Sequence, residues 1–288
     1  MKKQISFNIG GHRADIGETS IYRLLPNQHA HHVGHFVFLD YVPPFERKIK
    51  MMPDTGFAHP HRGIATLTYI LKGEAEHYDS YGNRATVHSG GVQWMKAGNG
   101  IVHDETVNPD TKTNSLLIHA FQFWINLPSK NKKENPDYMA IQANELPLFD
   151  LDDNGGWLKV VVGEYDGSRS KVPTYAKQYL YHIHLNMGKK FTLSSEKDLE
   201  YAVFLPQRGV TINDKEYNAG DFIGFDREEG IIELINNSEA EADIILFGGE
   251  KYREPFVAQG PFVMSTQEEI NEAYADFQGG KYGKVVYS

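Results

Sequence analysis

Two short histidine-containing alternations constrain this chain more than any other feature of its sequence. The first is His59-Pro60-His61, and the second, 42 positions after His61, is His103-Asp104-Glu105. In an extended strand, residues i and i+2 lie on the same face, so each alternation presents two ligand-type side chains together. We therefore expect two strands whose three imidazoles and one carboxylate surround a divalent ion. Mixed nitrogen and oxygen ligation suits iron, nickel, copper or zinc, and fits magnesium or calcium poorly. The alternative is that these histidines lie in surface loops, where Pro60 would also be at home.

The sequence around these motifs predicts an all-β fold. Residues 66–71 are β-branched and aromatic, and the segments 74–78, 84–88 and 92–95 follow at close spacing, with Gly and Asn at the turns between them. Short strands at this spacing are typical of a jelly-roll barrel. A second strand-rich block follows, with candidate strands at 157–162, 179–185, 201–205, 221–225 and 242–247.

The segment 128–150 is rich in Pro, Asn and Lys and is interpreted as a linker between two domains. We place an N-terminal, metal-binding domain at residues 1–140 and a C-terminal domain at residues 141–288. The C-terminal domain has its own alternation, His182-Ile183-His184, but no His-x-Glu motif follows it. Two ligands alone bind a metal weakly, so we expect this domain to be metal-free.

The C-terminal tail predicts a helix. Thr266-x-x-Glu269 matches a capping box, in which each end of the motif satisfies a free backbone N–H. The apolar residues Ile270, Ala273, Tyr274 and Phe277 fall on one helical face. Gly279 and Gly280 are expected to end the helix.

Composition excludes several classes of function. The formal net charge is −9, and the one short basic run, 130–133, is interpreted as a solvated loop, so a direct nucleic-acid binder is not expected. The absence of cysteine excludes disulfides and thiolate ligands. No apolar run is long enough to span a membrane and no signal-peptide core stands at the N-terminus, so we expect a cytoplasmic protein.

Other histidines are weighed separately. One cluster in the N-terminal region is interpreted as loop or interface residues: His29, His31, His32 and His35. Glu76, His77 and His88 are structural residues or supports of the metal ligands. His119 is the one polar group on the apolar face of 117–127, and we expect it to be buried and hydrogen-bonded, with a place in the metal cavity as the alternative.

Taken together, the motifs resemble the pirin family of the cupin superfamily. The resemblance is carried by six segments spread over the chain: His59-Pro60-His61-Arg62-Gly63, Val92-Gln93-Trp94-Met95, Ala97-Gly98-x-Gly100-Ile101-x-His103-x-Glu105, Phe123-Trp124-Ile125-Asn126-Leu127, Arg253-Glu254-Pro255 and Gly260-Pro261-Phe262-Val263-Met264. It implies a bicupin, with two jelly-roll β-barrels in tandem and a short C-terminal helix. It also implies one metal in the N-terminal barrel, with His59, His61, His103 and Glu105 as ligands.

The resemblance also implies an activity. Some bacterial members are associated with cleavage of flavonols, so we expect a metal-dependent, quercetin 2,3-dioxygenase-like enzyme with a small aromatic substrate. The expected ion is Fe(II), with nickel, copper, zinc or manganese as alternatives. Glu105, the one acid among the ligands, is the candidate catalytic base for the substrate hydroxyl. Trp94, Phe121 and Phe123 either line an aromatic pocket or belong to the ordinary core.

The alternative function is regulatory. Pirins are also described as metal- or redox-dependent proteins that bind transcription factors or metabolic enzymes, and an acidic surface suits a protein partner better than DNA. Two positions depart from the family pattern, since Ala65 stands where a Glu is usual and Gly91 where an Asp is usual. Loss of that Glu is expected to change the surroundings of the metal rather than its ligands.

Overall fold

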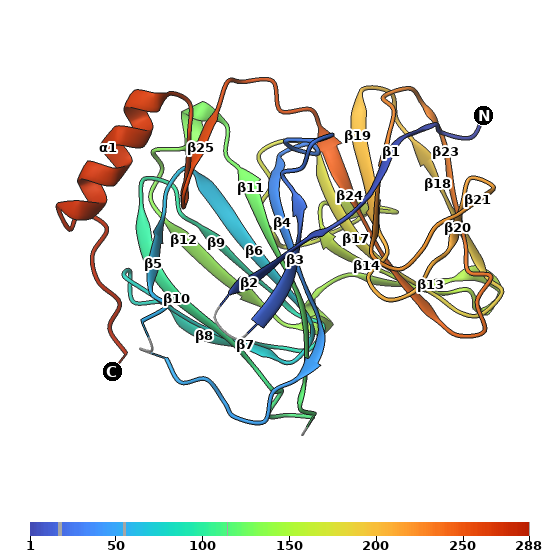
Figure 1. Cartoon of the computed structure of the whole chain (residues 1–288), viewed down its shortest axis with the longest axis horizontal. Helices are drawn as coiled ribbons and strands as arrows, with labels where there is room; N and C mark the ends of the chain where they lie inside the picture. Colours follow the sequence, from blue (N-terminus) through green and yellow to red (C-terminus); the bar gives the residue numbers. More distant parts are fainter. Residues whose placement is uncertain (17–18, 54–55, 114, 288) are drawn as a thin grey trace. The chain divides into compact units, whose positions relative to one another are not determined.

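The computed structural model describes residues 1–16, 19–53, 56–113 and 115–287. The described chain consists mostly of β-strands, with one α-helix near the C-terminus (Figure 1). The all-β prediction is therefore confirmed, and so is the helix. The chain falls into two compact units. One consists of residues 1–37 and 146–252, and the other consists of residues 38–145 and 253–288.

This division differs from the one placed at 140/141. The chain passes between the units at 37/38, 145/146 and 252/253, so each unit is built from two separate segments. The middle crossing lies close to the predicted boundary, whereas the two outer crossings have no counterpart in the prediction. The physical reason is long-range strand pairing, which a local sequence pattern does not reveal: β1 (Ile5–Gly10), for example, pairs with β22 (Asp221–Phe225).

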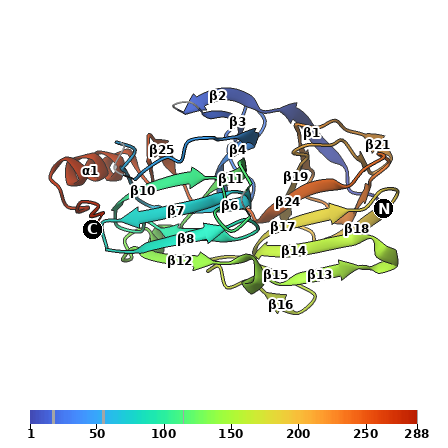
Figure 2. The same cartoon turned by 90° about the horizontal axis from the view of Figure 1, so that it is seen from below.

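The unit made of 38–145 and 253–288 holds both predicted metal motifs. Its strands of one seven-stranded sheet run in the order β12 (Asp137–Ile141), β9 (Val92–Lys96), β6 (Ile64–Lys72), β11 (Leu117–Asn126) and β4 (Phe36–Glu46). The second runs in the order β5 (His59–His61), β10 (Ile101–Asn108), β7 (Glu74–Asp79) and β8 (Arg84–His88). Figure 2 shows β10, β7 and β8 side by side. Two short 3₁₀ turns, Ser129–Asn131 and Ala143–Glu145, connect the later strands.

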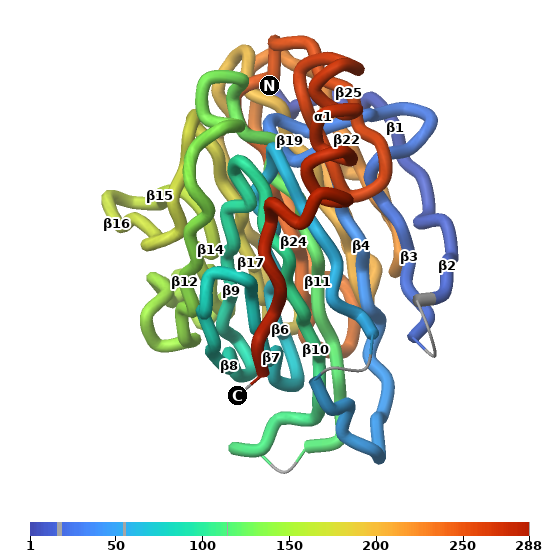
Figure 3. Tube along the Cα trace, turned by 90° about the vertical axis from the view of Figure 1, so that its left-hand side faces the viewer, coloured from blue at the N-terminus to red at the C-terminus, as the bar shows by residue number. Residues whose placement is uncertain are grey.

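The same unit ends in the hairpin of β25 (Val257–Gln259) and β26 (Phe262–Met264), followed by α1 (Gln267–Gln278). The Thr266 hydroxyl accepts a hydrogen bond from the Glu269 N–H at 3.2 Å, as the capping box predicts, whereas the Glu269 carboxylate accepts from the Ser265 N–H at 2.9 Å. Ile270 and Ala273 are fully buried. The tail after α1 returns to the second sheet, where Tyr287 donates to Asp104 at 2.7 Å (Figure 3).

The other unit has the same general plan. Its larger sheet runs β1, β22, β19 (Leu199–Phe204), β24 (Ala242–Glu250), β17 (Gln178–Leu185), β14 (Gly156–Val162) and β13 (Leu148–Leu151). Its smaller sheet runs β18 (Lys190–Ser195), β23 (Gly230–Ile235), β20 (Thr211–Ile212) and β21 (Lys215–Glu216). Side chains of both sheets, such as Ile183 and Leu234, share one apolar core. The remaining elements are the hairpins β2 (His12–Ile16) with β3 (Thr19–Leu25) and β15 (Glu164–Tyr165) with β16 (Ser168–Arg169), and the 3₁₀ turn Asp152–Asn154.

Candidate metal centre

The two histidine alternations lie on adjacent antiparallel strands. β5 pairs with β10 in a register that sets His59 opposite His103 and His61 opposite Ile101. Because His59, His61 and His103 share one face of this pair, their rings converge. Ring centroids are 4.9 Å apart for His59 and His61, 4.5 Å for His59 and His103, and 5.1 Å for His61 and His103. One nitrogen from each ring lies within 4.8 Å of the other two, which is close enough for one ion.

Backbone carbonyls select the tautomer of two of these rings. His59 Nδ1 donates to the Phe57 carbonyl at 2.7 Å, and His61 Nδ1 donates to the Pro261 carbonyl at 3.1 Å. A neutral imidazole has one N–H and one lone pair, so both rings keep the lone pair at Nε2. This is the support that metal-ligating histidines usually receive from the protein.

His103 is held differently. Its Nε2 lies 3.1 Å from His59 Nε2, while its Nδ1 is buried and has no hydrogen-bond partner among the described residues. Without an ion, one of the two Nε2 atoms must carry a proton for this contact to be favourable. With an ion between them, both lone pairs are used, and His103 keeps its proton at Nδ1.

The electrostatic environment favours the ligating form of the rings. His61 and His103 are each 2% exposed. Burial, together with the neighbouring His59, lowers the pKa of His61 to about 3. Burial also lowers the pKa of His103 well below its ordinary value. Both imidazoles are therefore neutral at physiological pH, as a metal ligand must be.

Glu105 lies on the same face of β10 as His103, but its carboxylate is not part of the cluster formed by His59, His61 and His103. Its carboxylate lies within 4.8 Å of ligand atoms of His77 and His103, and not of all three histidines named above. Glu105 Oε1 accepts a hydrogen bond from the Thr68 hydroxyl at 2.7 Å. Burial raises the pKa of Glu105, against the lowering effect of that hydrogen bond. The structure thus brings the three predicted histidines together and places the predicted carboxylate beside them, sharing His103.

His77 is the residue of this cluster that the ligand prediction did not include. It lies on β7 directly opposite Glu105 on β10, so the two side chains share a face. Its Nε2 donates to Asp79 Oδ2 at 3.0 Å, and its ring stacks on Tyr138 with centroids 4.0 Å apart and planes 10° from parallel. The sequence places His77 on a strand. The cross-strand register that could have identified its role is a property of the tertiary structure.

The donor set fits a divalent transition metal. It offers neutral imidazole nitrogens and a carboxylate, with no thiolate, and the rings at its centre are fixed by backbone carbonyls. The described residues therefore supply a candidate site for one such ion. Burial raises the pKa of Glu105 and so disfavours its ionised form, which a cation close by would stabilise.

The C-terminal segment fixes the strand that carries the first motif. The buried Arg62 guanidinium donates to Asp276 at 2.8 Å and to Glu272 at 2.9 Å, both on α1, and to Asn99 at 2.9 Å. Pro261, which accepts from His61, directly precedes β26. Figure 1 shows α1 and β25 on the side of the unit where β5 lies. The helix therefore has a structural purpose: it helps to hold His61 in place.

Lys132 contributes to the same attachment, and for this residue alone among the three lysines of the run the sequence-based interpretation was wrong, since Lys130 and Lys133 are exposed. The run 130–133 was expected to be a solvated loop, but Lys132 is 1% exposed. Its ammonium group donates to the Gly63 and Val263 carbonyls, each at 2.8 Å, and to the Asn126 side chain. Three acceptors satisfy its three N–H groups, which is why a lysine can be buried there. Burial lowers the pKa of Lys132 to about 7.

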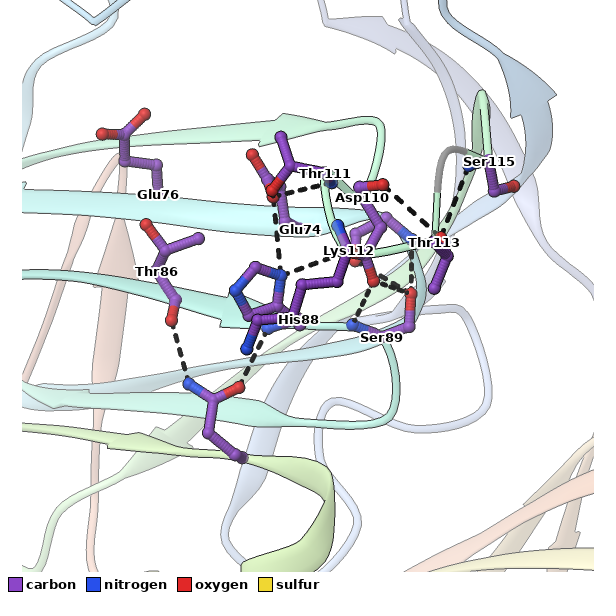
Figure 4. Close-up of polar contacts among 12 residues, drawn as sticks. Glu74, Glu76, Thr86, His88, Ser89, Asp110, Thr111, Lys112, Thr113 and Ser115 are labelled. Atoms are coloured by element: carbon purple, nitrogen blue, oxygen red, sulfur yellow. Dashed lines mark hydrogen bonds and ion pairs between the residues drawn. The ribbon is translucent and has the colours of Figure 1, made fainter.

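A second polar cluster of Glu74, His88 and Asp110 has a structural explanation (Figure 4). His88 Nδ1 lies 3.1 Å from Asp110 Oδ1 and 3.5 Å from Glu74 Oε2. The carboxylates of Asp110 and Glu74 already accept hydrogen bonds from other protein groups. Ser89 and Lys112 donate to Asp110, while Thr111 and Lys50 donate to Glu74. The cluster joins the end of β8 to the loop after β10.

His119 and the aromatic candidates belong to the interior. His119 is 3% exposed, and its Nε2 lies 3.1 Å from the Tyr41 hydroxyl, which confirms the prediction of a buried, hydrogen-bonded histidine. Trp94, Phe121 and Phe123 are fully buried, so the core interpretation holds for them. In the other unit, His32 lies 3.4 Å from Glu200, and His35 packs edge-on against Tyr252.

The two departures from the expected motif also have a structural context. Ala65 is buried between Lys96 on β9 and Ile125 on β11. At Gly91, an added Cβ would lie 2.7 Å from Val87 Cγ1 and 2.8 Å from the Ile141 carbonyl oxygen. An aspartate does not fit there without a backbone shift.

Among the described residues, no helix is long and apolar enough to cross a membrane.

Comparison with known proteins agrees with this geometry. Residues 18–125 match the Pirin family model, and residues 180–283 match the model described as Pirin C-terminal cupin domain. The chain is 30% identical over 284 residues to the Pseudomonas aeruginosa protein named "Putative quercetin 2,3-dioxygenase PA2418", covering 98% of this chain and 99% of that one. It is 32% identical over 262 residues to a pirin-like protein of Arabidopsis thaliana, covering 87% and 83% of the two chains.

Solved structures show the same fold. The crystal structure of a quercetin 2,3-dioxygenase from Acinetobacter baumannii superposes with a TM-score of 0.90 at 31% identity, covering 99% of this chain and 100% of that one. A bacterial pirin of Escherichia coli, solved in complex with nickel(II), has a TM-score of 0.64 at 20% identity, covering 85% of this chain and 99% of that one. From its two matched domains, its full-length relatives and its fold, this chain is a bicupin that belongs to the pirin family.

Proposed function

We propose that this protein is a metal-dependent dioxygenase that cleaves a flavonol, with one divalent ion held by His59, His61, His103 and Glu105. The observation that carries the proposal is that one nitrogen from each of three histidines lies within 4.8 Å of the other two. Backbone carbonyls accept the Nδ1 protons of two of these rings and so keep the lone pair at Nε2. We propose Fe(II) as the first ion to test, followed by nickel, copper, zinc and manganese.

The relatives supply the substrate class. Two proteins align with nearly the whole chain: one, at 30% identity, is named "Putative quercetin 2,3-dioxygenase PA2418", and the other, at 31% identity, is the Acinetobacter baumannii protein titled quercetin 2,3-dioxygenase. A flavonol has a hydroxyl and a keto oxygen on neighbouring carbons. A bound divalent ion would act as a Lewis acid toward these two oxygens and toward dioxygen.

The protein's own residues would prepare the substrate for oxygen attack. The Glu105 carboxylate, whose Oε1 accepts a hydrogen bond from the Thr68 hydroxyl, would also accept the proton from the flavonol hydroxyl. Removing that proton makes the ring electron-rich at the carbon that dioxygen attacks. Thr68 fixes the carboxylate, and the buried rings of His61 and His103 keep water away from one side of the site.

The test is turnover by protein loaded with a defined metal. Metal-free protein is reconstituted separately with each candidate ion, and flavonol absorbance and dissolved oxygen are followed together. We expect equimolar loss of both with at least one ion, and none with a His103→Ala variant treated identically. Absence of flavonol loss with every ion, in protein shown to hold the metal, would refute the proposed activity.

A further inference from the structure

Gln122 and Trp124 lie on β11 and have no role in the proposed proton transfer. Both side chains are partly exposed, whereas Phe121, Phe123 and Ile125, which alternate with them along the strand, are buried. Because alternate residues of a strand point to opposite faces, the two partly exposed side chains share one face of the sheet. A polar and an aromatic side chain together on such a face are the pair that a site for a small aromatic molecule requires.

The contacts of Gln122 place it beside the metal centre. The register of β6 and β11 sets Thr68 opposite Gln122. The Thr68 hydroxyl lies 2.8 Å from Gln122 Oε1 and 2.7 Å from Glu105 Oε1, so a single hydroxyl separates the amide from a candidate metal ligand. The face of β11 that carries Gln122 and Trp124 is therefore the face turned toward β10.

The amide of Gln122 is held at one end only. A primary amide forms hydrogen bonds at both its oxygen and its nitrogen, but among the described residues only Thr68 bonds to this one. Gln142 shows the opposite case, since its Nε2 donates to the Thr86 carbonyl at 2.9 Å and its Oε1 accepts from the His88 N–H at 3.2 Å. Gln142 is thus fully used by the protein, whereas one end of Gln122 is available to water or to a bound molecule.

Trp124 supplies an aromatic surface next to the same site. Its ring packs edge-on against His61, with centroids 5.0 Å apart and planes at 75°. Phe38, from β4, stacks on it with centroids 4.2 Å apart and planes 13° from parallel. The indole is therefore held in place by two other rings and still remains partly exposed. Offset-stacked and edge-to-face contacts are the ones that a planar substrate ring prefers with such a surface.

We propose that Gln122 and Trp124 determine which flavonols the protein accepts. Trp124 packs against an aromatic ring of the substrate, and the free end of Gln122 hydrogen-bonds a phenolic hydroxyl that does not react. A hydroxyl both donates and accepts, so it pairs with either atom of the amide. The inference rests on the proposed function and adds a preference to it: flavonols with further hydroxyls are favoured over one that carries only the reacting hydroxyl.

The test compares two flavonols, quercetin and 3-hydroxyflavone, which has only the reacting hydroxyl. The ratio of their kcat/KM values is measured in metal-loaded wild type and in Gln122→Met, which keeps the length of the side chain and removes the amide. We expect the ratio to fall by about 5-fold or more, the contribution typical of one hydrogen bond, because only the quercetin value decreases. A ratio taken within each protein cancels differences in metal content and in the intrinsic reactivity of the two substrates.

Two further variants complete the comparison. Gln142→Met is the matched control and should leave the ratio unchanged. Trp124→Leu should lower kcat/KM for both flavonols by similar factors, because both present aromatic rings. If Gln122→Met does not fold, Gln122→Asn, which withdraws the amide by one methylene, takes its place with the same expected change.

The outcomes separate this inference from the proposed activity. An unchanged ratio in a folded Gln122 variant, or an equal loss on both substrates, would overturn the role of Gln122 and leave the activity standing. If metal-loaded wild type turns over neither flavonol, the proposed activity is refuted, and binding decides the inference instead. Quenching of tryptophan fluorescence then measures the two Kd values: a selective loss of quercetin affinity in Gln122→Met supports the assignment, and an equal effect on both flavonols refutes it.

Discussion

The two His-x-His alternations of this chain are similar in sequence and different in chemistry. His59 and His61 lie on β5, and His182 and His184 lie on β17, so in both cases two imidazoles share one face of a strand. At β5 the neighbouring strand contributes His103. At β17 the neighbouring strand β24 contributes Asp243, whose Oδ1 lies 3.0 Å from His182 Nε2 and 2.7 Å from His184 Nδ1.

The partner atom decides what each pair can do. At β5, backbone carbonyls take the Nδ1 protons and leave Nε2 lone pairs that point at one another. At β17, a single carboxylate oxygen takes an N–H from each ring, and Trp157 stacks on His184 with planes 6° from parallel. The lone pairs of the first arrangement are free to bind a cation, whereas the N–H groups of the second are already bound to a carboxylate. A His-x-His motif is therefore informative only together with the residue opposite it.

The largest effect should come from removing His103, whose ring contributes a ligand atom both to the group with His59 and His61 and to the group with His77 and Glu105. His103→Ala leaves His59 and His61 without a third nitrogen, and we expect metal affinity to fall by at least about 100-fold, beyond the loss typical of a supporting residue. His182→Ala is the matched variant in the other unit. Elemental analysis after dialysis should show metal lost only from the first, and equal loss from both would break the comparison.

The turns after the two motifs should differ in their tolerance of a side chain. Gly63 has φ +82°, and an added Cβ would lie 2.0 Å from the Val263 carbonyl oxygen. Gly188 has φ +70° with nothing within 4 Å. We expect Gly63→Ala to lower the free energy of unfolding by about 3 kcal/mol or more, and Gly188→Ala by about 1 kcal/mol, which is the strain of a positive φ alone. Urea unfolding measures both, and equal losses would contradict the structure.

Removing the carboxylate of the β17 pair should destabilise the protein moderately. Asp243→Ala leaves two imidazole N–H groups without their acceptor, which should cost about 2 kcal/mol. The freed rings still lack a third ligand, so the variant should not gain a tightly bound metal. Thermal unfolding and metal analysis on the same sample test both parts. Tight metal binding by this variant would show that Asp243 alone separates the two sites.

The smallest effect should be a change in acid sensitivity. Burial would raise the pKa of Asp243, but His182 and His184 together lower it strongly. A carboxyl group with a lowered folded pKa contributes stability that is fully present above the unfolded pKa near 4, and that contribution is lost progressively as pH falls from there through the folded pKa. Burial lowers the pKa of His182, so the unfolded chain also takes up a proton below about pH 6.5. Asp243 opposes this lowering, so unfolding free energy should fall more steeply between pH 7 and 5 in Asp243→Asn than in wild type.

Local pattern was sufficient for the strands, for the C-terminal helix and for which side chains of the two histidine motifs share a face. Each depends on residues near one another in sequence: the i, i+2 alternation of His59 and His61, or the cap from Thr266 to Glu269. It failed for Lys132, because a buried lysine is stabilised by acceptors such as the Val263 carbonyl, which lies far along the chain. The two compact units show the same dependence on distant residues, since 1–37 and 253–288 each pack with segments distant in sequence.

The amino-acid sequence by itself therefore determined which side chains of β5 and β10 face the same way, because side-chain alternation is a property of a single strand. Tertiary structure decided which strand lies next to which, and in what register. That register sets His103 opposite His59, Glu105 opposite His77 and Asp243 opposite His184. Whether two imidazoles can bind a cation or instead bind a carboxylate depends on which side chain of the neighbouring strand lies within a few ångströms of them. Only the folded chain sets that distance.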